Sequence, residues 1–200
     1  MTKVVVPALA LRGLTIFPRA PLHFDVGRPQ SIQAVEEAMD SGSAIFLVAQ
    51  KELTAEYPKR TDLYDMGTLC EVKQILRLPG DSMRVMVEGT SRGRLLTLIQ
   101  REPFLRAEVE TVFEPVGKRP SVKTEALIRS TYEKIEQYAQ INPKLTPDIL
   151  LNILNSEDPG YIADYIAQNL TMRGEDKQSI LEELRPISRL RKLNQLLTRE

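Results

Sequence analysis

The order of apolar and polar residues divides this chain of 200 residues into two parts. In the first part, short runs rich in β-branched residues alternate with turns rich in proline and glycine, which is typical of strands. In the second part, apolar residues recur three and four positions apart, which predicts amphipathic helices. Residues 116–120 contain the glycine and proline of a domain boundary. We therefore predict a β-rich domain over 1–117 and an α-helical bundle over 118–200, so the fold class is α+β.

The short runs of the first part differ in their burial patterns. Residues 3–9 are rich in valine but contain Pro7, which predicts an edge strand or a bulge. Residues 22–26 alternate, so Leu22, Phe24 and Val26 should face a core. Residues 44–49 form a continuous apolar run, which is typical of a strand buried on both faces.

Two longer β-rich runs, residues 67–78 and 83–99, flank the turn residues 79–82, and we predict that they pair as a hairpin. Residues 104–112 alternate as a half-solvated strand does. One helix interrupts the strands, beginning near Pro29 and ending at Gly42, a candidate for a left-handed stop. Together these elements predict a partly closed barrel or a sandwich with one helix.

The second part predicts a series of helices with clear boundaries. Thr146-Pro147 and Asp158-Pro159 each combine a cap residue with a first-turn proline. Arg185-Pro186 should separate the last two helices. The final helix carries one apolar side, formed by Ile187, Leu190, Leu193 and Leu197. It reaches Glu200 without a glycine cap or a breaker, as a helix that continues further would.

Composition argues against several classes of protein. The 27 basic and 27 acidic residues give a formal net charge of zero, without the basic excess typical of nucleic-acid or acidic-membrane binding. No apolar run approaches the roughly 20 residues of a membrane span. The single cysteine, Cys70, cannot form an internal disulfide. We therefore expect a protein of the reducing cytoplasm that does not bind membranes.

The sequence contains no recognisable catalytic or metal site. Gly117-Lys118 resembles the end of a phosphate-binding loop, but Val112 and Arg119 occupy positions where that motif needs glycine and Ser/Thr. His23 lies on the polar side of an alternating strand, and one histidine with one cysteine cannot form a classical zinc site. No serine lies in a motif that indicates a Ser–Lys pair. We expect no catalytic residue, metal or cofactor in this chain.

Several short motifs occur in a defined order along the chain. The first is Ala8-Leu9-Ala10-Leu11-Arg12-Gly13-Leu14-Thr15-Ile16-Phe17-Pro18, followed closely by Asp25-Val26-Gly27-Arg28. Others lie at residues 21–22, 31–39, 47–51, 62–68, 74–79, 85–89, 163–166, 177–182 and 189–190. In this order and at these spacings, the motifs resemble the LON domain, the N-terminal segment of ATP-dependent Lon proteases. The departures, among them Ala10 where the family usually has proline, affect local geometry only.

The resemblance implies a fold and a function. The fold is a β-rich LON (PUA-like) barrel or sandwich followed by helices, which agrees with the patterns above. The function is recognition of unfolded or damaged proteins and their delivery to a hexameric ring. The ATPase, with its ATP and magnesium, and the Ser–Lys protease site would lie beyond Glu200. The chain alone should therefore have neither activity, and we expect it to be a monomer or a weak dimer.

The opening motif contains the candidate site residues. Gly27 should supply an unusual backbone angle, and Arg12 and Arg28 should tie loops to carbonyls or carboxylates; with Gly13 they form a structural motif. The apolar segment 14–22 contains two prolines, so it either buries itself against the core or presents a patch for partners. The candidate substrate-binding patch is Ile16, Phe17, Pro18, Pro21, Leu22 and Met66.

Two other functions remain as alternatives. One is a LON module that binds a ligand or a degradation signal with no protease attached. The other is a nucleic-acid-binding domain whose basic strip would consist of Arg92, Arg94, Arg101 and Arg106. Acidic residues alternate with these arginines and no aromatic ladder accompanies them, so the sequence favours protein substrates over nucleic acid.

Overall fold

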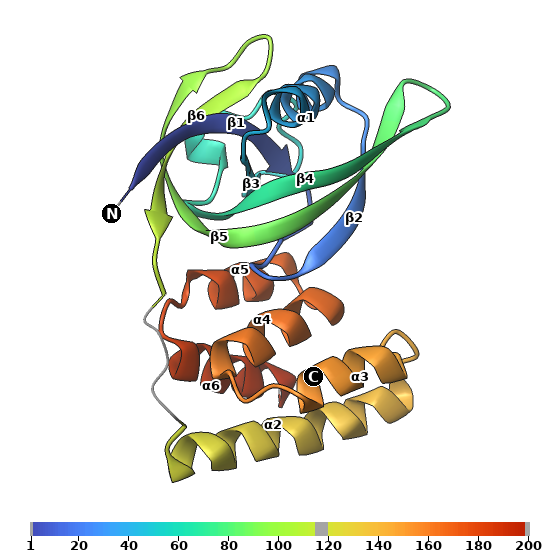
Figure 1. The fold of residues 1–200 in the computed structure, drawn as a ribbon, viewed down its shortest axis with the longest axis vertical. Helices are drawn as coiled ribbons and strands as arrows, with labels where there is room; N and C mark the ends of the chain where they lie inside the picture. The colour runs from blue at the N-terminus through green and yellow to red at the C-terminus, as the bar shows by residue number, and fades with distance from the viewer. Residues whose placement is uncertain (1, 115–119, 199–200) are drawn as a thin grey trace. The chain divides into compact units, whose positions relative to one another are not determined.

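The computed structural model describes residues 2–114 and 120–198. They form two compact units, Met1–Phe113 and Glu114–Glu200 (Figure 1). The first unit contains the strands and the second contains helices, so the predicted α+β class is confirmed. The predicted boundary at residue 117 and the Gly117-Lys118 pair lie outside the described residues.

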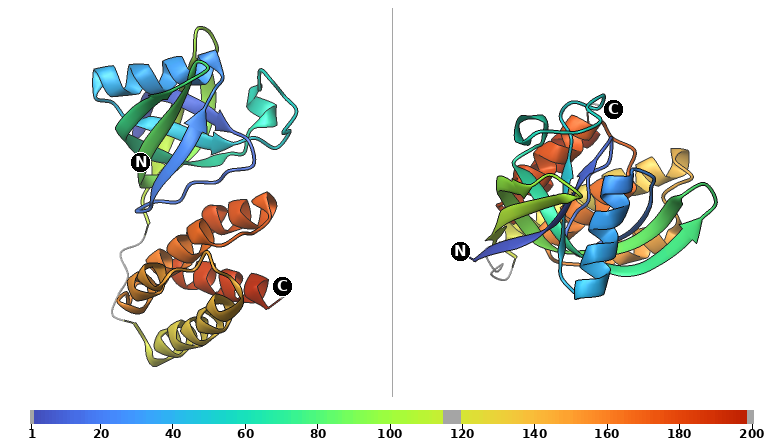
Figure 2. Two further views of the ribbon diagram at one scale, coloured as in Figure 1. Left: turned by 90° about the vertical axis from the view of Figure 1, so that its right-hand side faces the viewer. Right: turned by 90° about the horizontal axis from the view of Figure 1, so that it is seen from above.

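The first unit is a sheet of six strands that curls into a barrel (Figure 2). Its strands are β1 (Lys3–Leu11), β2 (Pro21–Val26), β3 (Ile45–Ala49), β4 (Met66–Leu78), β5 (Ser82–Gln100) and β6 (Leu105–Val112). The order is β2-β5-β4-β3-β1-β6, and an additional pairing of β5 with β6 closes the barrel. β5 has 19 residues, which lets its first half pair with β2 and its second half with β6. The predicted hairpin of β4 and β5 is confirmed.

The prediction that the valine-rich N-terminal run is an edge strand holds for its first half only. β1 lies inside the sheet, antiparallel to β6 along residues 3–8 and parallel to β3 along residues 8–11. Pro7 lies on the half of β1 that has β6 as its one neighbour. Proline has no N–H to donate. It is tolerated there because no strand pairs with the other side of β1 at that position.

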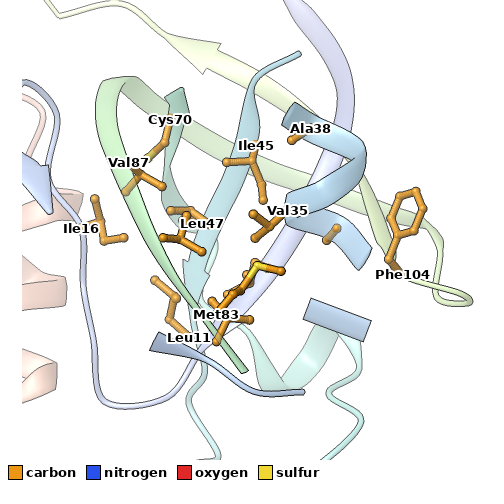
Figure 3. Packing of buried hydrophobic residues seen from close by; sticks show 14 residues of the cluster. Leu11, Ile16, Val35, Ala38, Ile45, Leu47, Cys70, Met83, Val87 and Phe104 are labelled. Atoms are coloured by element: carbon orange, nitrogen blue, oxygen red, sulfur yellow. The ribbon is translucent and has the colours of Figure 1, made fainter. Parts of the chain in front are cut away.

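The helix of the first unit, α1 (Pro29–Ser41), lies against the sheet and covers part of its core. It ends at Gly42, whose φ of 61° is the predicted left-handed stop. Figure 3 shows its residues Val35 and Ala38 among buried side chains of the strands, including Ile45. The predicted alternation of β2 is also present, since Val26 is buried while Leu22 and Phe24 pack partly buried against the same cluster.

The second unit contains the helices α2 (Val122–Ile141), α3 (Pro147–Leu154), α4 (Pro159–Asn169), α5 (Gly174–Glu182) and α6 (Pro186–Leu197). Asp158 caps α4 as predicted, whereas the Thr146 side chain makes no cap hydrogen bond. Three residues of the predicted α6 stripe are buried, but Ile187 is 42% exposed. The chain's last two residues lie outside the described part. No helix in the described part is long and apolar enough to cross a membrane.

A buried arginine connects several parts of the helical unit. Arg189 has an exposed fraction of 0%. Its Nη1 lies 2.9 Å from a carboxylate oxygen of Asp164, and its Nη2 lies 3.2 Å from Glu114. Its Nε donates to the carbonyl oxygen of Glu183. Because a buried guanidinium needs its donors satisfied, this set of partners fixes α6 against α4 and against the segment before α6.

Candidate functional site

Most of the predicted substrate-binding patch is buried. The exposed fraction is 2% for Ile16, 0% for Phe17 and 5% for Met66, and Pro18 is also buried. The expectation of an accessible patch is therefore wrong for these four residues. Pro21 is exposed and Leu22 is half-buried, so only these two remain available at the surface.

The segment after β1 is buried because it packs on the β4–β5 hairpin. Thr68 donates from its hydroxyl to the carbonyl oxygen of Ile16 at 2.5 Å. Arg19 donates from its backbone N–H to the carbonyl oxygen of Gly89 at 2.8 Å. Gly89 has no side chain, which allows the backbone of Phe17 to lie directly over β5. The result is that Ile16 joins the barrel core that Figure 3 shows.

The two arginines of the opening motif hold the loop between β3 and η1 (Arg60–Asp62), which we call the β3–η1 loop (residues 51–59). Arg12 donates to the carbonyl oxygen of Ala55 at 3.0 Å. Arg28 donates to the side-chain oxygen of Gln50 at 3.1 Å, to the carbonyl of Glu56 at 3.3 Å and to the carbonyl of Ala10. Burial lowers the pKa of Arg28, and the nearby charge of Arg12 acts in the same direction.

The two glycines of the motif differ from expectation. Gly13 has the left-handed φ of +66°, whereas Gly27 has no such angle. The prediction of an unusual backbone conformation at Gly27 is therefore wrong. The chain needs its left-handed residue earlier, at the turn directly after β1.

The β3–η1 loop forms one wall of an open pocket of about 260 Å³, which we call the loop pocket. Its lining residues come from the start of α1, from the β3–η1 loop, and from the turn between β5 and β6 with the first residue of β6; they are Gln30, Tyr57, Pro58, Arg101, Glu102 and Leu105. Arg101 donates from its guanidinium to the carbonyl oxygen of Tyr57 at 3.4 Å, and Gln30 donates to the carbonyl of Arg101. These two bonds connect all three walls.

The loop pocket has a mixed lining, with more polar than apolar surface. Pro58 and Leu105 are buried, and Tyr57 is 69% exposed. Arg101 and Glu102 are exposed and supply one charge of each sign. The volume is below the usual range for sites that bind drug-sized molecules. Leu53, which is 52% exposed, adds a second apolar side chain on the same loop.

The sequence analysis did not predict the loop pocket. Its residues lie in three segments, and no periodic pattern connects them. One signal was available: Tyr57-Pro58 is an aromatic–proline pair between the charged residues Glu56 and Lys59, and an aromatic residue in such a loop often contacts a partner.

The other sequence candidates have structural roles. Arg92 is fully buried, Arg94 pairs with Glu110, and Arg106 pairs with Glu37, so the four arginines do not form an open basic strip. Cys70 is buried, and burial raises the pKa of its thiol. Among the described residues, no group of histidine, cysteine, aspartate and glutamate side chains could hold a metal ion.

The first unit is a barrel covered by one helix, and the second unit is helical. Comparison of the chain with known protein families identifies the class of domain that has this architecture. A family model described as the ATP-dependent protease La (LON) substrate-binding domain matches residues 5–199. The chain belongs to this family. The predicted resemblance to the LON domain is thereby confirmed.

Relatives and solved structures agree with this assignment. A Lon protease of Heliobacterium modesticaldum is 43% identical over 194 residues, which cover 97% of this chain and 24% of that protein. A Lon protease of Desulforamulus reducens is 41% identical with the same coverage. The N-terminal domain of the Mycobacterium avium complex Lon protease matches at a TM-score of 0.73 and 19% identity, covering 98% of both chains. At that identity the structural match shows the fold alone. The chain spans about a quarter of the length of these curated relatives.

Proposed function

We propose that this domain captures unfolded or damaged proteins and presents them for degradation. The observation that carries the proposal is Tyr57, an aromatic side chain that is 69% exposed at the mouth of the loop pocket, in a domain of a substrate-binding family. Folded proteins hide most of their large apolar side chains, and unfolded chains expose them. A pocket for one such side chain therefore discriminates between the two states with little dependence on sequence.

The physical mechanism is weak, repeated capture. One pocket of this size gives low affinity, because ordering a flexible chain opposes the gain from contact. In the whole protein, a homo-hexamer would place several copies of the domain around one entrance and raise the effective concentration. An ATPase module using ATP and magnesium would then pull the chain, and a Ser–Lys site would cleave it. We place this activity in the cytoplasm.

A titration followed by NMR tests the proposal. The labelled chain is mixed with a destabilised variant of a model protein, and separately with its stable parent. We expect signals of Leu53, Tyr57 and Leu105 to shift with the destabilised variant only. Equal shifts with the folded parent, or no shifts with the unfolded form, would rule out capture through this pocket. Tight binding of one peptide sequence alone would instead favour the module that reads a degradation signal.

A further inference from the structure

β2 has a neighbour on one side only. It is the end strand of the sheet order and pairs with β5 along all of its residues, from Pro21 opposite Glu88 to Val26 opposite Met83 (Figure 1). In the described part of the chain, no other segment forms backbone hydrogen bonds with residues 21–26. The outer side of β2 therefore presents unpaired N–H and C=O groups to its surroundings.

Every second residue of β2 directs its backbone N–H and C=O groups away from β5. Gly89 on β5 donates to the carbonyl oxygen of Ala20, so the backbone of Ala20 faces β5. Backbone direction alternates along a strand, which turns Pro21, His23 and Asp25 outward and Leu22 and Phe24 toward β5. Proline fits this assignment because its missing N–H then falls on the free side. His23 and Asp25 each present one N–H and one C=O at the edge.

The side chains beside this edge favour a particular kind of strand. Leu22 and Phe24 are half-buried against the barrel core, so each keeps part of its apolar surface exposed. On the other face, Asp25 pairs with Arg84 at 2.7 Å and His23 is exposed. A strand added at this edge would place every second side chain beside Leu22 or Phe24. Residues of the added strand that lie beside Leu22 or Phe24 should be apolar, and the residues between them should be polar.

The comparable edge of β4 is blocked. β3 pairs with β4 only along residues 68–70, which leaves the later part of β4 without a neighbour on that side. There, Arg77 forms an ion pair with Glu36 of α1 at 2.6 Å, and the register shifts between Val72 and Gln74. A crossing side chain and a bulge are common protections of sheet edges. β2 has neither feature along residues 21–26, and only Pro21, at its first position, lacks an outward N–H donor.

We propose that the outer edge of β2 binds an extended segment of an unfolded protein as an added strand, with apolar residues at alternate positions. This inference rests on the proposed function and names its substrate class: segments that form strands when folded. Backbone hydrogen bonds supply affinity that does not depend on sequence, and the exposed parts of Leu22 and Phe24 supply the preference for alternation. The loop pocket is a separate contact elsewhere on the barrel.

Amide hydrogen exchange of the chain measures this pairing directly. The probe is a synthetic peptide with valine at alternate positions. The amides of His23 and Asp25 should exchange rapidly in the free chain and at least tenfold more slowly with saturating peptide. The amides of Leu22 and Phe24 bond to β5 and should be protected in both states, which provides an internal control. Peptide binding without new protection at His23 and Asp25, or absence of peptide binding, would overturn the added strand. The NMR titration with a destabilised protein tests the proposed function separately, because it follows the loop pocket.

A matched pair of variants provides a second test. His23→Pro removes one outward N–H and leaves the bonds to β5 in place, whereas His23→Ala keeps that N–H. We expect about fivefold weaker peptide binding for the proline variant than for the alanine variant, the effect of one hydrogen bond. A peptide of equal composition with its valines at helical spacing should bind less tightly than the alternating one. Equal affinity of both variants would overturn the inference. Protection of the His23 and Asp25 amides without peptide, in a chain that sediments as a dimer, would also overturn it, because a second copy would then occupy the edge.

Discussion

Gly89 lies directly against the backbone of Phe17: a Cβ atom on Gly89 would be 2.4 Å from the Phe17 carbonyl oxygen. This close contact between the two backbones holds the proline-containing segment after β1 against the barrel. It converts a segment that looks like a candidate partner surface into part of the core. We therefore propose the β3–η1 loop and the edge of β2 as the surfaces that contact substrates.

Replacing Gly89 with alanine should destabilise the first unit by about 2 kcal/mol, because backbone atoms cannot move aside as a flexible side chain does. Gly27→Ala is the matched control, since a Cβ there meets no atom within 4 Å and the backbone angle is ordinary. Urea unfolding of both variants measures the difference. Equal transition midpoints for the two variants would show that the Phe17 segment is not held in this way.

Replacing Arg28 with lysine should loosen the β3–η1 loop although the charge remains. Lysine cannot reproduce the planar set of donors that reaches Gln50, Glu56 and Ala10 together. We expect a loss of about 1–3 kcal/mol in stability and faster amide exchange over residues 52–58. Arg77→Lys, which alters an exposed ion pair, is the control. Unchanged exchange in the loop of the Arg28 variant would contradict the structural role.

Removing the aromatic ring at the loop pocket should weaken capture of unfolded protein. Tyr57→Ser removes an exposed aromatic side chain that lines the pocket, and we expect binding to fall about fivefold or more. Leu76→Ser is the control, because Leu76 is also exposed, at 56%, but does not line the pocket. Fluorescence anisotropy with a labelled unfolded protein compares them. A larger effect at Leu76 would place the capture surface on the β4–β5 hairpin.

The thiol of Cys70 should be unreactive in the folded protein. It is fully buried, and burial raises its pKa, so the reactive thiolate is scarce at neutral and mildly alkaline pH. Iodoacetamide at pH 8 should label it only as fast as the first unit unfolds. Mass spectrometry at increasing urea concentrations measures the rate. Rapid and complete labelling without urea would contradict the burial of Cys70.

Replacing Arg189 with methionine should destabilise the helical unit by about 3–5 kcal/mol, because it leaves the buried carboxylate of Asp164 without this partner. Arg185→Met, in the residue before α6, is the control, since Arg185 is exposed and its pairing with Glu183 should contribute less than about 1 kcal/mol. The circular dichroism signal of the helices, recorded at increasing urea concentration, measures the stability of both variants. Similar losses for the two variants would show that the buried pair contributes little.

Local patterns were sufficient to predict most of the elements. The hairpin of β4 and β5, the end of α1 at Gly42 and the cap of α4 at Asp158 depend on residues close together in sequence. The family resemblance also rests on short motifs and their spacing. These features can be predicted because turn geometry, capping and periodicity are local physical effects.

The tertiary structure decided which apolar residues are buried and which edges are free. The backbone of Phe17 lies against β5 because a glycine far along the chain leaves room for it, and β1 lies inside the sheet where β3 pairs with its second half. The loop pocket likewise joins three distant segments. By itself the sequence determined the elements, their order and the family. It did not determine the binding surface, because burial and strand neighbours depend on contacts between residues that no local pattern connects.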